Sequence, residues 1–142
     1  MKPAVEQVLA GLAGTIGAEV IPAISEPYAV GHAGAAAMLG IFVAQDYDRA
    51  AEIHARAIQE MQALFRHASA SSADDRLAAL ADEPLAGHRV SALGAQRARL
   101  QEALIALHAA AEAAGDRALE RSILEALARD AHRRALFIPP MG

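Results

Sequence analysis

PYAVGHAGAAAMLGIFVA, residues 27–44, is apolar almost throughout, and His32 is its only clearly polar side chain. A helix that is apolar on all sides is either the buried centre of a bundle or a membrane span. The stretch is short for a span and rich in Ala and Gly, and its neighbours Glu26, Asp46 and Asp48 replace the usual flanking Trp, Lys or Arg. We therefore expect it to form the buried central helix of a soluble bundle.

The composition of the 142-residue chain also favours packed helices. Hydrophobic residues make up 54% and charged residues 21%, which excludes overall disorder. The apolar residues are mainly Ala and Leu, the strongest helix formers, and a core of such small side chains needs helix backbones that approach closely. The absence of Cys excludes disulfides and thiolate metal sites.

Upstream of this stretch, helical spacing of apolar residues predicts a helix that ends at the break between Pro22 and Pro27, with Ser25 as the N-cap of the next helix. We expect its buried stripe to be Val5, Val8, Leu9, Leu12, Ile16, Val20 and Ile24. Close packing of neighbouring backbones is the expected role of Gly11, Gly14, Gly17, Gly31, Gly34 and Gly40.

Downstream, Asp46 is expected to cap a helix that runs to about Ala68. A Ser-rich loop over 69–73 should follow it. Ser72 and Asp75 are then expected to form a capping-box-like start to a short helix over 76–81. The buried stripe of the longer helix is predicted to be Ala50, Ile53, Ala57, Ile58, Met61, Leu64 and Phe65. Its solvent face should pair charges four residues apart, at Glu52, Arg56 and Glu60.

Two long helices are predicted to complete the chain, over about 89–114 and 117–136. Gly115 has the position of a helix C′ residue and Asp116 that of the next N-cap. The expected core positions are Leu93, Leu100, Leu104, Leu107, Ala111, Leu119, Ile123, Leu127 and Ala131. The sequence thus predicts a single all-α domain over residues 1–142, an up-and-down bundle of four long helices plus one short helix.

Charge argues against nucleic acid as a partner. The net charge is −4, and neither half of the chain carries an excess of Lys and Arg that could form a basic face. The beginning of the sequence lacks the charged and apolar regions of a signal peptide. We expect a soluble cytoplasmic protein without a membrane partner.

No catalytic motif is recognisable. No Glu is followed three residues later by His, as di-metal carboxylate bundles require, and no Ser stands in a Gly-x-Ser-x-Gly or Ser-x-x-Lys context. The spacing Gly11-x-x-Gly14-x-x-Gly17 is not a dinucleotide fingerprint, because those glycines fall inside a helical pattern. We predict no catalytic residue and no cofactor.

Histidines are the remaining candidates for chemistry. His32, expected to be buried beside Tyr28, needs a hydrogen-bond partner, and either a structural or a ligand-binding role is open to it. His54 could join Tyr28 and His32 at a ligand pocket between helices. Alternatively His54 could join His108 and Glu112, which lie four residues apart, at a metal site, although the ligand spacing is not that of a known metal motif.

Residues 5–45, with Glu19-Val20-Ile21-Pro22-Ala23 followed by the Ala-rich run 33–39, resemble a group of small, uncharacterised helical bacterial proteins. Members of that group are often encoded beside acyl-CoA dehydrogenases and aminoglycoside-phosphotransferase-like kinases. The resemblance implies a helical fold and at most a neighbourly link to acyl-CoA metabolism, and it brings no catalytic residues.

Our functional expectation is a non-enzymatic helical interaction or accessory protein that forms a homodimer, the commonest state of small symmetric oligomers. The sequence leaves room for a further protein partner but does not identify it. The alternative is a small-molecule-binding bundle, or an enzyme, with a pocket near His32, His54 and Tyr28.

Overall fold

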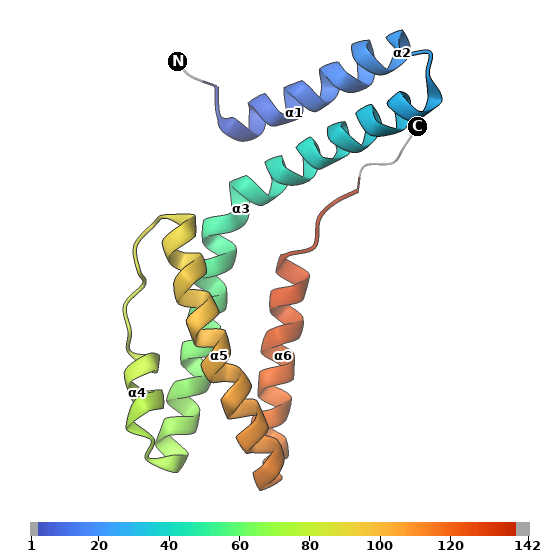
Figure 1. Cartoon of the computed structure of the whole chain (residues 1–142). Helices are drawn as coiled ribbons and strands as arrows, with labels where there is room; N and C mark the ends of the chain where they lie inside the picture. Colours follow the sequence, from blue (N-terminus) through green and yellow to red (C-terminus); the bar gives the residue numbers. More distant parts are fainter. Residues whose placement is uncertain (1–2, 139–142) are drawn as a thin grey trace. The chain divides into compact units, whose positions relative to one another are not determined.

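Helices are the only regular elements in the computed structural model, which describes residues 3–138 (Figure 1). The all-α expectation is therefore confirmed. In chain order the elements are α1 (Val5–Thr15), the π-helical η1 (Ile16–Val20), α2 (Ile21–Ala23), α3 (Pro27–Ser72), α4 (Asp75–Ala81), α5 (Val90–Ala114) and α6 (Arg117–Arg133). The sequence Ile138-Pro139-Pro140-Met141-Gly142 is not expected to be helical, and residues 139–142 lie outside the described residues.

The chain forms two compact units. Unit 1 contains the described residues up to Arg49 together with 136–138, and unit 2 contains Ala50–Ala135. Helix α3 contributes its first half to unit 1 and its second half to unit 2.

In unit 1, α1, η1 and α2 follow one another without a break, and the π-turn between them has a local cause. The N–H of Ile21 bonds to the carbonyl of Ile16, five residues earlier. Pro22 has no N–H with which to continue a regular ladder, and π-turns accommodate such interruptions. After the extended Ile24, the carboxylate of Glu26 accepts hydrogen bonds from the N–H groups of Tyr28 and Ala29. Glu26, rather than the predicted Ser25, therefore caps α3.

Helix α3 runs over 46 residues, so the predicted break at Asp46 is wrong. No Gly or Pro occurs between Ile41 and Ser72, and an acidic residue alone does not end a helix. The predicted Ser-rich loop is instead the last turn of α3, where Ser69, Ser71 and Ser72 donate to carbonyls three or four residues earlier. The helix stops before Ala73, which has a φ of 53°.

The expectation of a buried central helix over residues 27–44 is also wrong. In the apolar 18-residue window of α3, only 6% of the residues are buried. Val5, Val8, Leu12 and Val20, expected in the core, are exposed as well. A Cβ added at Gly11, Gly14, Gly17, Gly31 or Gly34 would meet no atom within 4 Å, whereas at Gly40 it would lie 3.5 Å from Cβ of Ala13. Close helix packing is thus confirmed at Gly40 alone among these glycines.

Unit 2 contains the hydrophobic core. The second half of α3 buries its predicted stripe, with Leu64 half-buried, and α5 buries all five predicted positions. Phe65, Ile58, Leu100 and Ile123 are the largest fully buried side chains, and they come from α3, α5 and α6. On α6, Leu127 and Ala131 are exposed, contrary to expectation, and Ala126 and Asp130 take their place in the core.

Helix α4 and the segment 82–89 carry the chain back along unit 2, so that α5 runs in the same direction as the second half of α3 (Figure 1). Asp74, rather than the predicted Ser72, caps α4 by accepting from the N–H groups of Arg76 and Leu77. The buried amide of Gln96 fixes the return segment: its oxygen accepts from Ala86 N–H at 2.9 Å, and its nitrogen donates to Pro84 O at 2.9 Å.

The predicted turn between the last two helices is confirmed. Gly115 adopts a left-handed φ of 69°, and Oδ1 of Asp116 accepts a hydrogen bond from Leu119 N–H at 3.0 Å. This reversal brings the first turn of α6 against the last turns of α5. Helix α6 ends at Arg133, three residues before the predicted end.

Candidate functional site

Tyr28 and His32 lie one turn apart on α3 and contact each other. Their ring centroids are 4.2 Å apart and their planes are tilted by 58°. Both side chains are exposed, so the prediction that His32 is buried is wrong. The reason is that the first half of α3 keeps an uncovered face, on which both residues lie.

His54, the third member of the predicted ligand pocket, belongs to unit 2 and is half-buried. A Cβ added at Gly94 of α5 would lie 3.7 Å from Cε1 and 3.8 Å from Nε2 of His54. The imidazole therefore rests close to the α5 backbone, at a place where a glycine leaves room for it. Tyr28 and His32 belong to unit 1.

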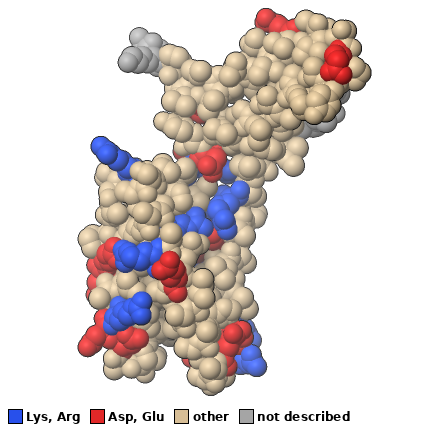
Figure 2. Space-filling view, in the orientation of Figure 1, with Lys and Arg blue, Asp and Glu red and all other residues tan. Residues whose placement is uncertain are grey.

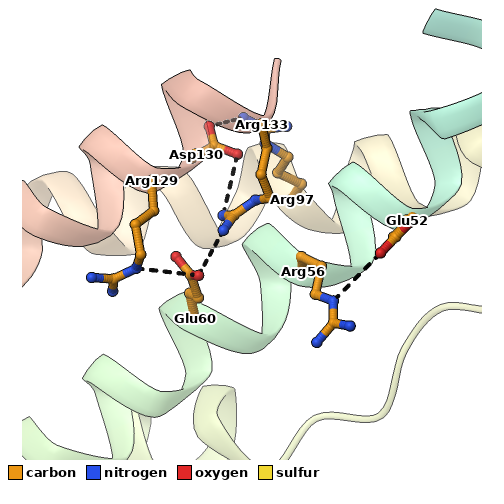
Figure 3. Close-up of polar contacts among 7 residues, drawn as sticks. All are labelled: Glu52, Arg56, Glu60, Arg97, Arg129, Asp130 and Arg133. Atoms are coloured by element: carbon orange, nitrogen blue, oxygen red, sulfur yellow. Dashed lines mark hydrogen bonds and ion pairs between the residues drawn. The ribbon is translucent and has the colours of Figure 1, made fainter. Parts of the chain in front are cut away.

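A cluster of charged residues joins α3, α5 and α6 within unit 2 (Figure 3). Its centre is the buried pair of Arg97 and Asp130, in which Nη2 of Arg97 donates to Oδ2 of Asp130 at 2.7 Å. The same Oδ2 lies 3.1 Å from Arg134. Oε1 of Glu60 accepts from Arg133 at 2.7 Å and from Arg129 at 3.4 Å. We call this set the ion-pair cluster: Glu60, Arg97, Arg129, Asp130, Arg133 and Arg134.

The electrostatics of the ion-pair cluster depend on arginine. Burial raises the pKa of Glu60, but the hydrogen bonds and positive charges of Arg133 and Arg129 together outweigh that effect and lower the pKa below its ordinary value. The hydrogen bond to Glu60 also raises the pKa of Arg133. Four arginines against two carboxylates leave an excess of positive charge at this end of α6.

The cavity at the ion-pair cluster is small, about 20 Å³, and Glu60, Arg97 and Asp130 are among its lining residues. That volume is enough for a single water molecule. Oε2 of Glu60, Oδ1 of Asp130, and Nε and Nη2 of Arg133 are buried without a hydrogen bond, and one water could satisfy some of them. The cluster therefore suits a role in fixing the register of three helices better than a role in binding a substrate.

Sequence reasoning missed this cluster, although a signal was present. Arg97 lies four residues after Leu93 and three before Leu100, within the buried stripe of α5, and Asp130 lies seven residues after the buried Ile123. Glu60 pairs with α6 rather than with Arg56 on the solvent face, contrary to expectation. The predicted pair of Glu52 and Arg56 is present, at 3.8 Å (Figure 3).

The predicted metal residues are brought together only in part. Among the described residues, His108, Glu112 and Glu120 form a group whose potential ligand atoms all lie within 4.8 Å of one another, and His54 is not in it. Helical spacing could not predict Glu120, from the first turn of α6, because its approach depends on the α5–α6 turn. Glu120 accepts a hydrogen bond from Arg117 at 2.7 Å, which raises the pKa of that arginine.

No model of a protein family matches this chain, and neither does any curated protein or solved structure in the comparisons.

Proposed function

We propose that this chain is a non-enzymatic, cytoplasmic interaction protein that forms a homodimer through an exposed apolar seam on the first half of α3. The observation that carries the proposal is the exposure of large apolar side chains along one side of that helix. Tyr28 is 72% exposed, Leu39 61%, Val43 52% and Tyr47 55%. Isolated exposed apolar residues are ordinary, but a continuous row of them marks an interaction surface.

The spacing of the exposed residues is that of a helix–helix seam. Positions 28, 32, 35 and 39 follow one another at intervals of four, three and four residues, which places them on one side of an α-helix, and positions 43 and 47 continue the row. All six are exposed. We call this row the seam: Tyr28, His32, Ala35, Leu39, Val43 and Tyr47.

A second copy of the chain is the occupant that fits this surface. No Lys or Arg occurs between residues 3 and 48, and the face of unit 1 visible in Figure 2 is mostly uncharged with a few carboxylates. The surface therefore offers no basic group to an acidic partner. A two-fold dimer needs no opposite charge, because it places the same apolar row against itself.

The seam supplies part of the area that a stable interface needs. A standard interface buries about 800 Å² per partner. Aromatic side chains bury about 150–250 Å² each, so Tyr28 and Tyr47, at their observed exposure, supply about a third of that area. Leu39, Val43 and Ala35 extend the same row.

A bilayer is the other apolar environment that α3 could enter, because α3 is long and apolar enough to cross one. Its composition argues against this. Half of residues 27–44 are Ala or Gly, which gain less from lipid than Leu or Ile. Interfacial and spanning helices are typically bordered by Lys, Arg or Trp, whereas this one is bordered by Glu26, Asp46 and Asp48. The resemblance of residues 5–45 to helical bacterial proteins brings no catalytic residue and accords with an accessory role.

The proposal is tested by measuring the molar mass of the full chain by size-exclusion chromatography with light scattering, across a range of concentrations. Wild type should have twice the 14.8 kDa mass of one chain, and Leu39→Glu should be monomeric. Leu124→Glu is the matched control, because Leu124 is 51% exposed on α6 in unit 2, and this variant should remain dimeric. A monomeric wild type would overturn the proposal, as would recovery only from membranes or flotation with liposomes.

A further inference from the structure

A group of potential metal ligands lies in unit 2, where α5 ends and α6 begins. His108 and Glu112 are one turn apart on α5, so their side chains project from the same side of the helix. Glu120 lies in the first turn of α6, and the left-handed Gly115 reverses the chain so that this turn faces α5. One imidazole nitrogen and two carboxylates thus converge from two helices.

The imidazole of His108, whose side chain is 28% exposed, lacks a hydrogen bond at one nitrogen among the described residues. Its Nε2 atom is buried and makes no hydrogen bond, and the nearest carboxylate oxygen, Oε1 of Glu112, lies 3.9 Å away. A buried nitrogen without a partner is costly, because it has lost its contact with water. By contrast, the carboxylate of Glu120 has a partner, because it accepts a hydrogen bond from Arg117.

We propose that His108, Glu112 and Glu120 bind Zn²⁺, with water in the fourth position of a tetrahedral site. Zinc takes nitrogen and carboxylate oxygen ligands at about 2.0–2.2 Å, which puts neighbouring ligand atoms about 3.3 Å apart. The three ligand atoms here lie within 4.8 Å of one another, so they would have to approach one another further to hold the ion. Two carboxylates and a neutral imidazole would balance the charge of the ion.

Arg117 competes with the ion for Glu120. Its guanidinium holds Oε2 of Glu120 at 2.7 Å, but the arginine side chain is 79% exposed and free to move into solvent. This contact uses one oxygen of Glu120, and the guanidinium places a positive charge beside the proposed site. The arginine therefore lowers the affinity for zinc, and its removal should raise it. A group that merely stabilised the start of α6 would not respond to Arg117 in this way.

The test is calorimetric titration of zinc chloride into the full-length protein after treatment with EDTA, with the absorption of Co²⁺ as a second readout. We expect one ion per chain and a visible band typical of four-coordinate Co²⁺. His108→Ala should abolish binding, Glu120→Gln should weaken it about tenfold, and Arg117→Gln should strengthen it by about the same factor. The matched control is His67→Ala on α3, an exposed histidine that should leave the affinity unchanged.

Several outcomes would overturn the site. These are the absence of saturable zinc binding and of a Co²⁺ band in wild type, and undiminished binding in a His108→Ala variant whose circular dichroism matches wild type. Unchanged affinity in Glu120→Gln would place Glu120 outside the coordination sphere and refute the three-ligand site. Because the group lies in unit 2 and the seam in unit 1, failure of one proposal leaves the other standing.

Discussion

Unit 1 and unit 2 use similar apolar residues in opposite ways. Unit 2 packs Ile58, Phe65 and Leu100 into a core to which α3, α4, α5 and α6 contribute, and the ion-pair cluster joins three of those helices. Among the described glycines of unit 1, Gly40 alone approaches a neighbouring helix, and the side chains of the seam are exposed. Apolar content therefore does not distinguish a core from an exposed surface in this chain. What differs is the number of helices available to cover each face.

The largest expected effect separates the two units directly. Phe65→Ala should lower the free energy of unfolding by about 3–5 kcal/mol, because it leaves a cavity in the core of unit 2. Leu12→Ala in unit 1 should change it by no more than about 0.5 kcal/mol, since Leu12 is exposed. Urea unfolding followed by circular dichroism measures both. Equal losses would show that unit 1 has a core of comparable quality.

An intermediate effect depends on pH. The pKa of Glu60 is lowered in the folded protein. Its ionised carboxylate therefore contributes fully to the free energy of unfolding above the unfolded pKa of about 4.3, and this contribution is lost as the pH falls through the pKa of the folded state. Glu60→Gln should therefore cost about 1–2 kcal/mol at pH 7. The difference from wild type should shrink as the pH falls below about 4.3.

Urea midpoints measured from about pH 7 to about pH 3 would follow this change. The control is Glu19→Gln, an exposed carboxylate of unit 1, which should stay within about 0.5 kcal/mol of wild type at pH 7. If the loss of unfolding free energy in Glu60→Gln stayed constant over this whole pH range, the stabilisation by Glu60 would not depend on its charge.

The smallest expected effect concerns the helix surfaces of unit 1. Gly34→Leu should leave stability unchanged or raise it by up to about 0.8 kcal/mol, because there is open space at Gly34 and leucine favours a helix more than glycine does. Both tyrosines of the chain lie in unit 1, so tyrosine fluorescence during urea unfolding reports on that unit. A loss of about 1–3 kcal/mol would instead reveal a close neighbour at Gly34.

The reach of sequence-based prediction in this chain depends on how local each signal is. The turn at Gly115 and Asp116 and the stripe around Ile58 depend on a few neighbouring residues, and both predictions are confirmed. The predicted break at Asp46 is wrong because a capping residue is also tolerated within a helix when no Gly or Pro comes after it. The predicted burial of residues 27–44 is wrong because apolar residues mark a helix face whose burial is favourable. They do not show whether the chain has other helices that pack on that face.

The same distinction between local signals and tertiary packing applies to the candidate sites. His108 and Glu112 could be paired from their spacing on one helix, whereas Glu120 required the packing of α6 on α5. Arg97 lies within an apolar stripe, and its pairing with Asp130 depends on the packing of α6 on α5, which helical spacing does not predict. The prediction that His32 is buried is wrong for the same reason as the predicted burial of residues 27–44.

The continuity of α3 has a consequence for dissecting the molecule. Domains are usually joined by exposed linkers, which proteases cut and at which engineered fragments begin. Here the boundary between the units falls at Ala50, inside a helix with no interruption from Pro27 to Ser72. A fragment starting there would begin with up to about four backbone N–H groups that have lost their partners, and the piece left behind would end with as many unpaired carbonyls. The second crossing between the units, at Ala135 and Leu136, lies outside the helices, but the crossing at Ala50 offers no loop at which the two units could be separated.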